Sequence, residues 1–288
     1  MLRFRRSALL AAVVAIAPVL GAISVPHTSA QARAGLVGPK QFYLALGDSL
    51  AYGYQPNFRF GLGYADDWLK EMQQSDPGLT LTNLACPGET LVTFINGKCP
   101  LHFIIKTRYR GAQFKAALKF LQGHPGQVSP VTIDIGANDF MALFDPTSCT
   151  VLTTTQGISD AIAAFDSNFT SVLRQLKTAL TDPNTHQQTG DLFTMNYYDP
   201  FATTCAGHDD VLSLITTLNQ HLEADANSEG VPWADVFTAF GGAASPNPQL
   251  CTLTWMCRSW PKNVLSRIHA TRQGYTVIFQ QFQALAGY

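Results

Sequence analysis

Charged residues are scarce in this chain. Asp, Glu, Lys and Arg together supply 14% of its 288 residues, and the formal net charge is −1. A typical globular protein has about 25% charged residues. There is no basic run of the kind that binds nucleic acid and no acidic block of the kind that forms a tail. The composition therefore excludes a nucleic-acid partner and favours a nearly neutral globular protein.

Long apolar runs are missing after the N-terminus. The one run covers residues 8–25, with three arginines before it and small residues after it. This order is typical of a secretory signal peptide, and the run is short for a membrane span, which needs about 20 apolar residues. We predict a signal peptide over residues 1–30, with cleavage after Ala30 or Ala34. We therefore expect a secreted, extracellular protein without a stable membrane anchor.

Closely spaced cysteine pairs are also missing. Zinc sites place two cysteines two to four residues apart, and none of the six cysteines here lies that close to another. An even number of cysteines in a secreted chain indicates disulfides instead, although six cysteines allow fifteen pairings. Nearest-neighbour pairing closes local loops, and on that basis we predict the bonds Cys86–Cys99, Cys149–Cys205 and Cys251–Cys257.

Short apolar runs alternate with longer periodic segments in the rest of the chain. The runs predict five strands: Phe42–Leu46, Leu79–Leu84, Val131–Ile135, Leu192–Asn196 and Trp233–Phe237. Helical spacing of apolar residues covers residues 112–121, 158–180, 209–227 and 272–285. Strands that alternate with helices imply a parallel sheet covered on both faces. We predict one α/β domain over residues 31–288, a three-layer α/β/α sandwich with a flavodoxin-like five-stranded parallel sheet.

Four polar motifs fall at the predicted strand ends and at the start of the last helix. They are Gly47-Asp48-Ser49-Leu50, Pro87-Gly88-Glu89-Thr90, Gly136-Ala137-Asn138-Asp139 and Ile268-His269-Ala270-Thr271. Parallel sheets bind ligands beyond the carboxyl ends of their strands, so these motifs are expected to meet. A serine at such an edge is a candidate nucleophile, which needs a base to take its proton and donors for the developing oxyanion.

The four motifs together resemble those of the SGNH hydrolases, also called GDSL esterases and lipases. The resemblance spans nearly all of residues 31–288, and the phrase Met195-Asn196-Tyr197-Tyr198-Asp199-Pro200 is similar to the secreted bacterial branch. It implies that Ser49 is the nucleophile and His269 the general base. It also implies an oxyanion hole made by the backbone N–H groups of Ser49 and Gly88 and the side-chain amide of Asn138.

The resemblance implies a secreted serine esterase or lipase that cleaves carboxylic esters through an acyl-enzyme. We expect a small-molecule or lipid ester as substrate, no metal or organic cofactor, and a monomer. Two other functions stay open: an acetyl esterase that acts on polysaccharide, and a non-catalytic protein that binds glycan or lipid. The aromatic residues after the nucleophile are candidates to line an acyl groove: Tyr52, Tyr54, Phe58 and Phe60.

Each motif residue also has an ordinary structural interpretation. Gly88 fits a turn after Pro87, Asn138 fits a helix N-cap, and His269 fits a surface position near a helix start. Asp139 is interpreted as a helix-start residue. The remaining histidines after residue 31 lie in no motif and are interpreted as structural or solvated: His102, His124, His186, His208 and His221.

A carboxylate is missing where the resemblance requires one. The family places an aspartate three residues before the histidine, but this chain has Ser266 there and no acid between Asn263 and His269. We predict a Ser49–His269 dyad in which the imidazole Nδ1–H donates to a backbone carbonyl near Val264–Ser266. A carboxylate from elsewhere in the chain and the Ser266 hydroxyl are the alternatives.

Overall fold

The computed structural model describes residues 35–201, 205 and 207–288. The predicted signal peptide and both cleavage positions lie outside these residues. Within the described ranges, no helix has the length and apolar character that a membrane crossing requires.

A five-stranded parallel sheet forms the centre of the molecule. Its strands are β1 (Phe42–Gly47), β2 (Thr80–Asn83), β3 (Val128–Asp134), β6 (Leu192–Met195) and β7 (Trp233–Ala234). Their order in space is β2-β1-β3-β6-β7, and every adjacent pair is parallel. The chain thus crosses back over its first strand, which is the flavodoxin-like order. The predicted fold class is confirmed.

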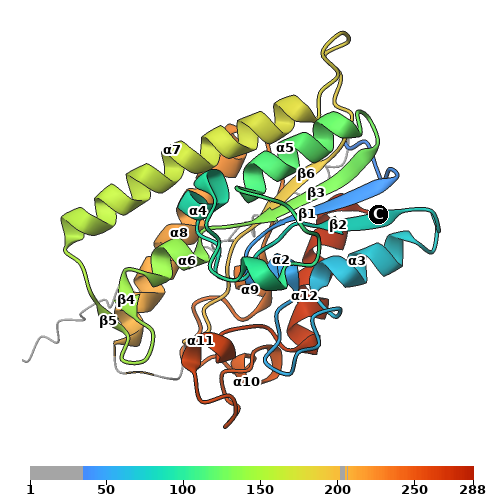
Figure 1. The fold of residues 1–288 in the computed structure, drawn as a ribbon. Coiled ribbons are helices and arrows are strands. Elements are labelled where there is room, and N and C mark those ends of the chain that lie inside the picture. The colour runs from blue at the N-terminus through green and yellow to red at the C-terminus, as the bar shows by residue number, and fades with distance from the viewer. Residues whose placement is uncertain (1–34, 202–204, 206) are drawn as a thin grey trace, which may run out of the picture.

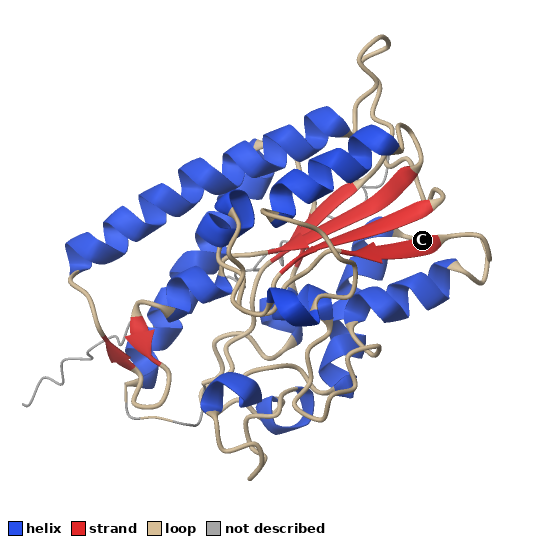
Figure 2. Ribbon diagram, viewed as in Figure 1, coloured by secondary structure: helices blue, strands red, loops and turns tan. Residues whose placement is uncertain are grey.

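Helices cover both faces of this sheet, as Figures 1 and 2 show. One layer contains α5 (Gln113–Gly123), α7 (Thr155–Ala179) and α8 (His208–Ser228), and the other contains α3 (Tyr64–Met72) and α12 (Arg272–Ala286). Shorter elements lie mainly in the connecting loops: α2 (Ser49–Tyr52), α4 (Leu91–Asn96), η1 (His102–Ile104), α6 (Ala137–Met141), β4 (Phe144–Asp145), β5 (Thr150–Val151), α9 (Val236–Ala239), α10 (Leu250–Leu253) and α11 (Val264–Arg267).

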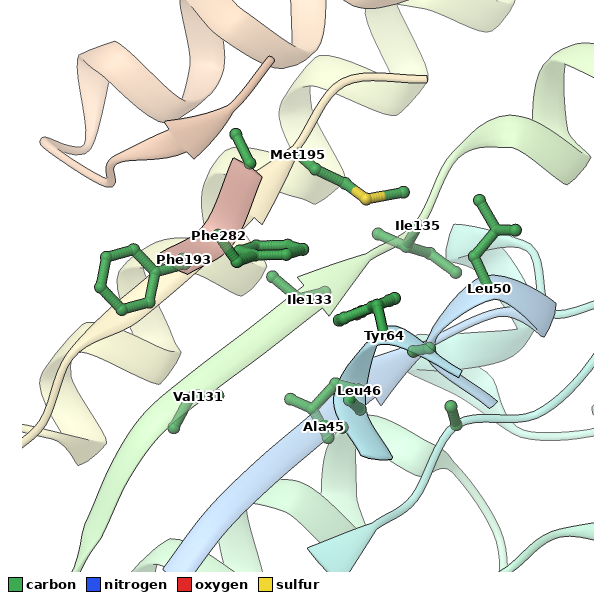
Figure 3. Packing of buried hydrophobic residues seen from close by; sticks show 14 of the residues in the cluster. Ala45, Leu46, Leu50, Tyr64, Val131, Ile133, Ile135, Phe193, Met195 and Phe282 are labelled. Atoms are coloured by element: carbon green, nitrogen blue, oxygen red, sulfur yellow. The ribbon is translucent and has the colours of Figure 1, made fainter. Parts of the chain in front are cut away.

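The core between sheet and helices is apolar and aromatic. Alternate residues of a strand point to one face, so Ala45 of β1 lies with Phe193 and Met195 of β6 on the side of α3 and α12 (Figure 3). There Tyr64 of α3 stacks on Phe282 of α12, with ring centroids 5.1 Å apart. These helices are therefore fastened to the same strands whose ends carry the polar motifs.

Three disulfides join the pairs that nearest-neighbour pairing predicts. They connect Cys86 to Cys99, Cys149 to Cys205 and Cys251 to Cys257, and no described cysteine is free. The first ties the segment after β2 to the segment before η1. The last closes a short loop at α10, so two of the three bonds hold loops that lead toward the motif residues.

Several predicted boundaries differ from the observed ones. The strand β7 ends at Ala234 because the Asp235 side chain accepts the Thr238 N–H and starts α9. The strand β3 begins at Val128, three residues before the predicted start, although Pro130 within it lacks an N–H. The helix α3 was not predicted from the sequence, because polar residues on its exposed face interrupt the apolar pattern.

Candidate active site

The nucleophile motif is a sharp turn from strand to helix. The strand β1 ends at Gly47, whose φ is +127°, and α2 begins at Ser49. A Cβ on Gly47 would collide with the carbonyl oxygen of Asp134 on the neighbouring strand, so glycine is required there. The Asp48 carboxylate accepts the Leu50 N–H at 2.9 Å as the helix N-cap. The turn leaves Ser49 half-buried at the sheet edge.

Gln113 at the start of α5 holds this turn from the side. Its Oε1 accepts the Gly47 N–H at 2.7 Å, and its Nε2 donates to the Gly47 carbonyl at 3.0 Å. The same amide nitrogen donates to the buried Glu89 carboxylate at 3.0 Å. Gln113 therefore couples the loop of Ser49 to the loop of Gly88. Nothing in the sequence singled it out, because a glutamine at a helix start is common.

His269 lies directly against Ser49. Its Nε2 is 2.8 Å from Ser49 Oγ, and its Nδ1 is 3.0 Å from the backbone carbonyl oxygen of Ser266. A carbonyl oxygen only accepts hydrogen bonds, so Nδ1 carries the imidazole proton and Nε2 accepts from the Ser49 hydroxyl. The atom that faces Nδ1 is the Ser266 carbonyl rather than its hydroxyl, and neither ring nitrogen contacts a carboxylate among the described residues.

The segment that carries His269 is fixed by neighbouring elements. The Tyr198 hydroxyl donates to the Ile268 carbonyl at 2.8 Å, and the Trp255 N–H donates to the His269 carbonyl at 3.0 Å. The ring of Tyr54 lies 4.5 Å from the imidazole, centroid to centroid. Burial lowers the pKa of His269 to about 4, although the Ser266 carbonyl favours the charged form. The imidazole is therefore neutral at pH 7, as a general base must be.

Gly88 occupies the turn position that its structural interpretation assigns to it. The Glu89 N–H donates to the Cys86 carbonyl at 3.1 Å, and Gly88 has φ +82°, as the third residue of a type II turn requires. Its own N–H, like that of Ser49, donates to no group of the described residues. The turn thus leaves the Gly88 N–H unused at the sheet edge, and the turn does not conflict with an oxyanion role for this group.

Asn138 lies within α6 rather than at its N-cap, which is Gly136. One of its two amide hydrogens is used, because Nδ2 donates to the Glu89 carbonyl at 2.8 Å. The second amide hydrogen donates to no group among the described residues. The next residue, Asp139, accepts the Leu91 N–H at the start of α4 at 2.9 Å, and burial raises its pKa to about 6. Asp139 is a helix-start residue that also holds the adjacent helix.

Two buried carboxyl groups lie beneath the Ser49 turn without reaching the histidine. Asp48 Oδ2 accepts the Tyr197 hydroxyl at 3.1 Å, and Asp134 Oδ2 accepts the Ala51 N–H at 2.8 Å. Burial raises the pKa of Asp48 to about 7 and that of Asp134 well above its usual range. The charge of Asp48 further raises the pKa of Asp134. Both groups support the backbone of the turn.

An apolar pocket opens beside Ser49 and His269. Its volume is about 570 Å³ including the open mouth, and Asn138 lies on its wall. The rest of the lining is mostly aliphatic and aromatic: Phe140, Met141, Phe144, Tyr197, Tyr198, Pro200, Phe201, Ile215, Leu218 and Ile268. None of the aromatic residues expected to line an acyl groove borders it. They lie at the end of α2 and in the loop after it, where Tyr54 contacts the imidazole. The pocket is built instead by α6, β4, α8 and the segment after β6.

Of the other histidines, His186 is exposed and His102 packs edge-on against Tyr109 with its Nε2 buried and unpaired among the described residues. His208 Nε2 is 2.6 Å from Asp199, His221 Nδ1 is 2.9 Å from Asp166, and His124 Nδ1 is 2.9 Å from the Phe120 carbonyl. One group of potential metal ligands occurs among the described residues, at Cys86, Glu89 and Cys99. Its two sulfurs form a disulfide, so they offer no thiolate to a metal.

Solved structures of an esterase and a lipase resemble this chain in fold. Among solved structures, an acetylxylan esterase from Geobacillus stearothermophilus matches 88% of this chain and 96% of its own, with a TM-score of 0.55 and 14% identity. A lipase from a goat rumen metagenome matches with 86% and 98% coverage, a TM-score of 0.55 and 17% identity. Likeness at these identities shows the fold alone. A comparison with curated protein sequences finds no match.

The family comparison covers most of the chain. The sequence pattern of the GDSL-like lipase/acylhydrolase family matches residues 45–277, a range that contains all four polar motifs. The chain belongs to the GDSL-like lipase/acylhydrolase family.

Proposed function

We propose that this chain is a secreted serine esterase or lipase that hydrolyses carboxylic esters through an acyl-enzyme on Ser49. The contact of 2.8 Å between Ser49 Oγ and His269 Nε2, beside an apolar pocket, carries the proposal. Two solved structures of the acetylxylan esterase are described as catalytic mutants, and they replace a histidine and a serine by alanine. The same pair of residue types meets in this chain.

In the proposed reaction, His269 Nε2 takes the hydroxyl proton as Ser49 Oγ attacks the ester carbonyl. The N–H groups of Ser49 and Gly88 and the Asn138 amide would donate to the oxyanion, and each such donor typically contributes about 3 kcal/mol. The protonated imidazole then gives its proton to the leaving alkoxide. Water attacks the acyl-enzyme by the same route in reverse, which releases the acid and restores Ser49.

The Ser266 carbonyl takes the place of the usual aspartate. Its hydrogen bond of 3.0 Å from Nδ1–H holds the tautomer and the ring orientation that proton transfer needs. A carbonyl dipole stabilises the imidazolium less than a full negative charge would. Burial of the ring also disfavours the charged imidazolium, and the pKa of His269 is therefore low. The dyad is therefore expected to work with a weak base that is always in its active form near neutral pH.

The pocket lining supports an acyl group larger than acetyl. Against aliphatic and aromatic walls, each buried methylene beyond the acetyl group contributes about 0.8 kcal/mol to binding. An acetyl esterase on polysaccharide is the alternative, in line with the name of the Geobacillus structure. The predicted signal peptide and the three disulfides support secretion into an oxidising compartment.

Assays on p-nitrophenyl esters of increasing acyl length test the proposal. We expect turnover that rises beyond the acetate ester and falls by about 10³-fold or more in Ser49→Ala and His269→Ala. If the Ser49→Ala protein still hydrolyses the esters, Ser49 is not the nucleophile. Absence of turnover by the unmodified chain would favour the non-catalytic alternative, and a maximum at acetate would favour the acetyl esterase.

Ser266→Ala tests whether the carbonyl or the hydroxyl of residue 266 accepts the hydrogen bond from His269 Nδ1–H. The substitution deletes the hydroxyl but keeps the backbone oxygen that contacts Nδ1. We expect kcat close to that of the unmodified protein, with the same pH profile. A large loss of kcat in a folded Ser266→Ala protein would instead assign the hydroxyl as the acceptor.

A further inference from the structure

Large apolar side chains are exposed in one region of the molecule. Among the described residues, the strongly exposed ones are Phe58, Val92, Phe103, Leu152, Trp260 and Leu265. All six belong to loops or short elements at the carboxyl-end edge of the sheet, which is the edge of the active site. Exposed apolar residues that gather in one place mark an interaction surface, whereas scattered ones do not.

Four of these side chains lie in segments that contact neighbours of the catalytic residues. We call Phe58, Phe103, Trp260 and Leu265 the apolar rim; their exposed fractions run from 45% to 75%. Phe58 packs edge-on against Phe60, 5.9 Å between centroids, and Phe60 stacks on the Tyr54 ring that touches His269.

The other rim segments reach the site from two further sides. The segment of Phe103 contacts the nucleophile helix, because the Tyr52 hydroxyl donates to the Ile104 carbonyl at 2.9 Å. Trp260 and Leu265 precede Ser266, whose carbonyl holds the His269 imidazole. The segments of the apolar rim therefore contact Tyr54, the nucleophile helix and the residue that supports His269.

Basic residues accompany the rim without acidic ones. Arg59 follows Phe58, Lys98 precedes Phe103, and Arg258 and Lys262 flank Trp260; all four are exposed. No Asp or Glu occurs in residues 49–65, 90–133 or 240–288. Acidic residues concentrate instead in residues 151–239, which include α7 and α8. The segments that carry the apolar rim are therefore basic, whereas exposed Asp209 and Asp210 begin α8 on the pocket side of the same edge.

We propose that the apolar rim docks the protein on an anionic lipid–water interface, with the Ser49 pocket open toward the lipid. Exposed Phe, Trp and Leu enter the interface while neighbouring Lys and Arg bind anionic headgroups, the combination used by proteins that lie on membranes. The complementarity of charge favours a negative surface, and the apolar pocket beside Ser49 gives an acyl chain a place to go. A soluble acidic polymer would bind the Lys and Arg side chains but would offer no apolar environment to the exposed aromatic side chains.

Vesicle binding by the Ser49→Ala protein tests the proposal without hydrolysis of the lipid. We expect co-sedimentation with vesicles of phosphatidylglycerol and phosphatidylcholine, weaker binding to phosphatidylcholine alone, and weakening by salt. Trp260 should report docking through a blue shift of its emission, which Trp260→Phe removes while binding persists. Because the test needs no turnover, it stands apart from the proposed ester hydrolysis.

Variants locate the docking surface. Phe58→Ser/Phe103→Ser/Trp260→Ser, in the Ser49→Ala background, should lower the vesicle partition coefficient by about tenfold or more. Arg258→Gln/Lys262→Gln should weaken binding. The matched pair Lys70→Gln/Lys119→Gln should not, because both lysines are exposed late in helices that run back to the opposite sheet edge. In the Ser49 background the triple variant should keep its turnover of a short water-soluble ester, which shows that it folds.

Four results would overturn the proposal. These are absence of vesicle binding, a triple variant that binds like its parent, equal weakening by the two glutamine pairs, and binding to a soluble anionic polysaccharide but not to vesicles.

Discussion

Burial governs the protonation of His269 at the scale of single residues. The imidazole lies beside Tyr54 and against Ser49, and the described residues stabilise its charged form through a carbonyl rather than a carboxylate. Desolvation therefore dominates and lowers the pKa from its ordinary 6.5 to about 4. The sign matters for function, because a lowered pKa extends the pH range in which the histidine is a neutral base.

The acidic limb of the pH profile should report this pKa. We expect kcat/KM for a p-nitrophenyl ester to stay level as the pH falls from 8 through 6.5, and to decline only toward the pKa of about 4. Circular dichroism at each pH, and recovery of activity on return to pH 7, control for acid unfolding. A midpoint near 6.5 in folded protein would mean that the imidazole is less buried than described, or is supported by a carboxylate.

At the scale of elements, the junction between β1 and α2 decides where the nucleophile lies. Gly47 has φ +127°, and the adjacent strand β3 leaves no room for a side chain there. Gln113 of α5 holds both backbone groups of Gly47, and Asp48 caps α2. Three separate elements thus fix one turn, so a change in any of them is expected to move Ser49.

Gly47→Ala should destabilise the fold by more than about 4 kcal/mol, or prevent folding, since it combines forbidden backbone geometry with a collision. Gly126→Ala is the matched control: Gly126 also has positive φ, +70°, but nothing lies within 4 Å of the added Cβ. That change should cost only about 1–2 kcal/mol. Urea denaturation measures both, and equal costs would contradict the steric argument.

At the scale of the whole molecule, disulfides and charge distribution set how the domain behaves outside a cell. The bond Cys149–Cys205 joins residues 56 apart, whereas Cys251–Cys257 joins residues 6 apart. A longer loop loses more entropy on closure in the unfolded chain, so the first bond should contribute about 4 kcal/mol and the second about 2 kcal/mol. The segments around them are those that build the pocket and carry His269.

Removing each bond tests this ranking. Dithiothreitol should lower the melting temperature. Cys149→Ala/Cys205→Ala should reduce the free energy of unfolding more than Cys251→Ala/Cys257→Ala does, as measured by urea denaturation without reductant. An unchanged melting temperature on reduction, or the reverse order of the two variants, would contradict the loop-length explanation.

Local pattern determined much of this protein. Alternating strand and helix periodicity predicted the parallel sheet, and the four motifs predicted the meeting of Ser49, Gly88, Asn138 and His269 at one edge. This works because strand alternation and turn residues act over a few neighbours in the chain. The missing acid before His269 was likewise visible in the sequence.

Only the tertiary structure decided which atoms support those residues. Gln113 reaches Gly47 from another helix, Tyr198 reaches Ile268 across 70 residues, and the Ser266 carbonyl rather than its hydroxyl faces the imidazole. The pocket is lined by segments far from the nucleophile, not by the aromatic residues that follow it. Such contacts depend on how distant elements pack, and no local pattern encodes them. The same holds for the basic residues beside the apolar rim, because they lie far apart in the chain and share one edge of the sheet only in the folded protein.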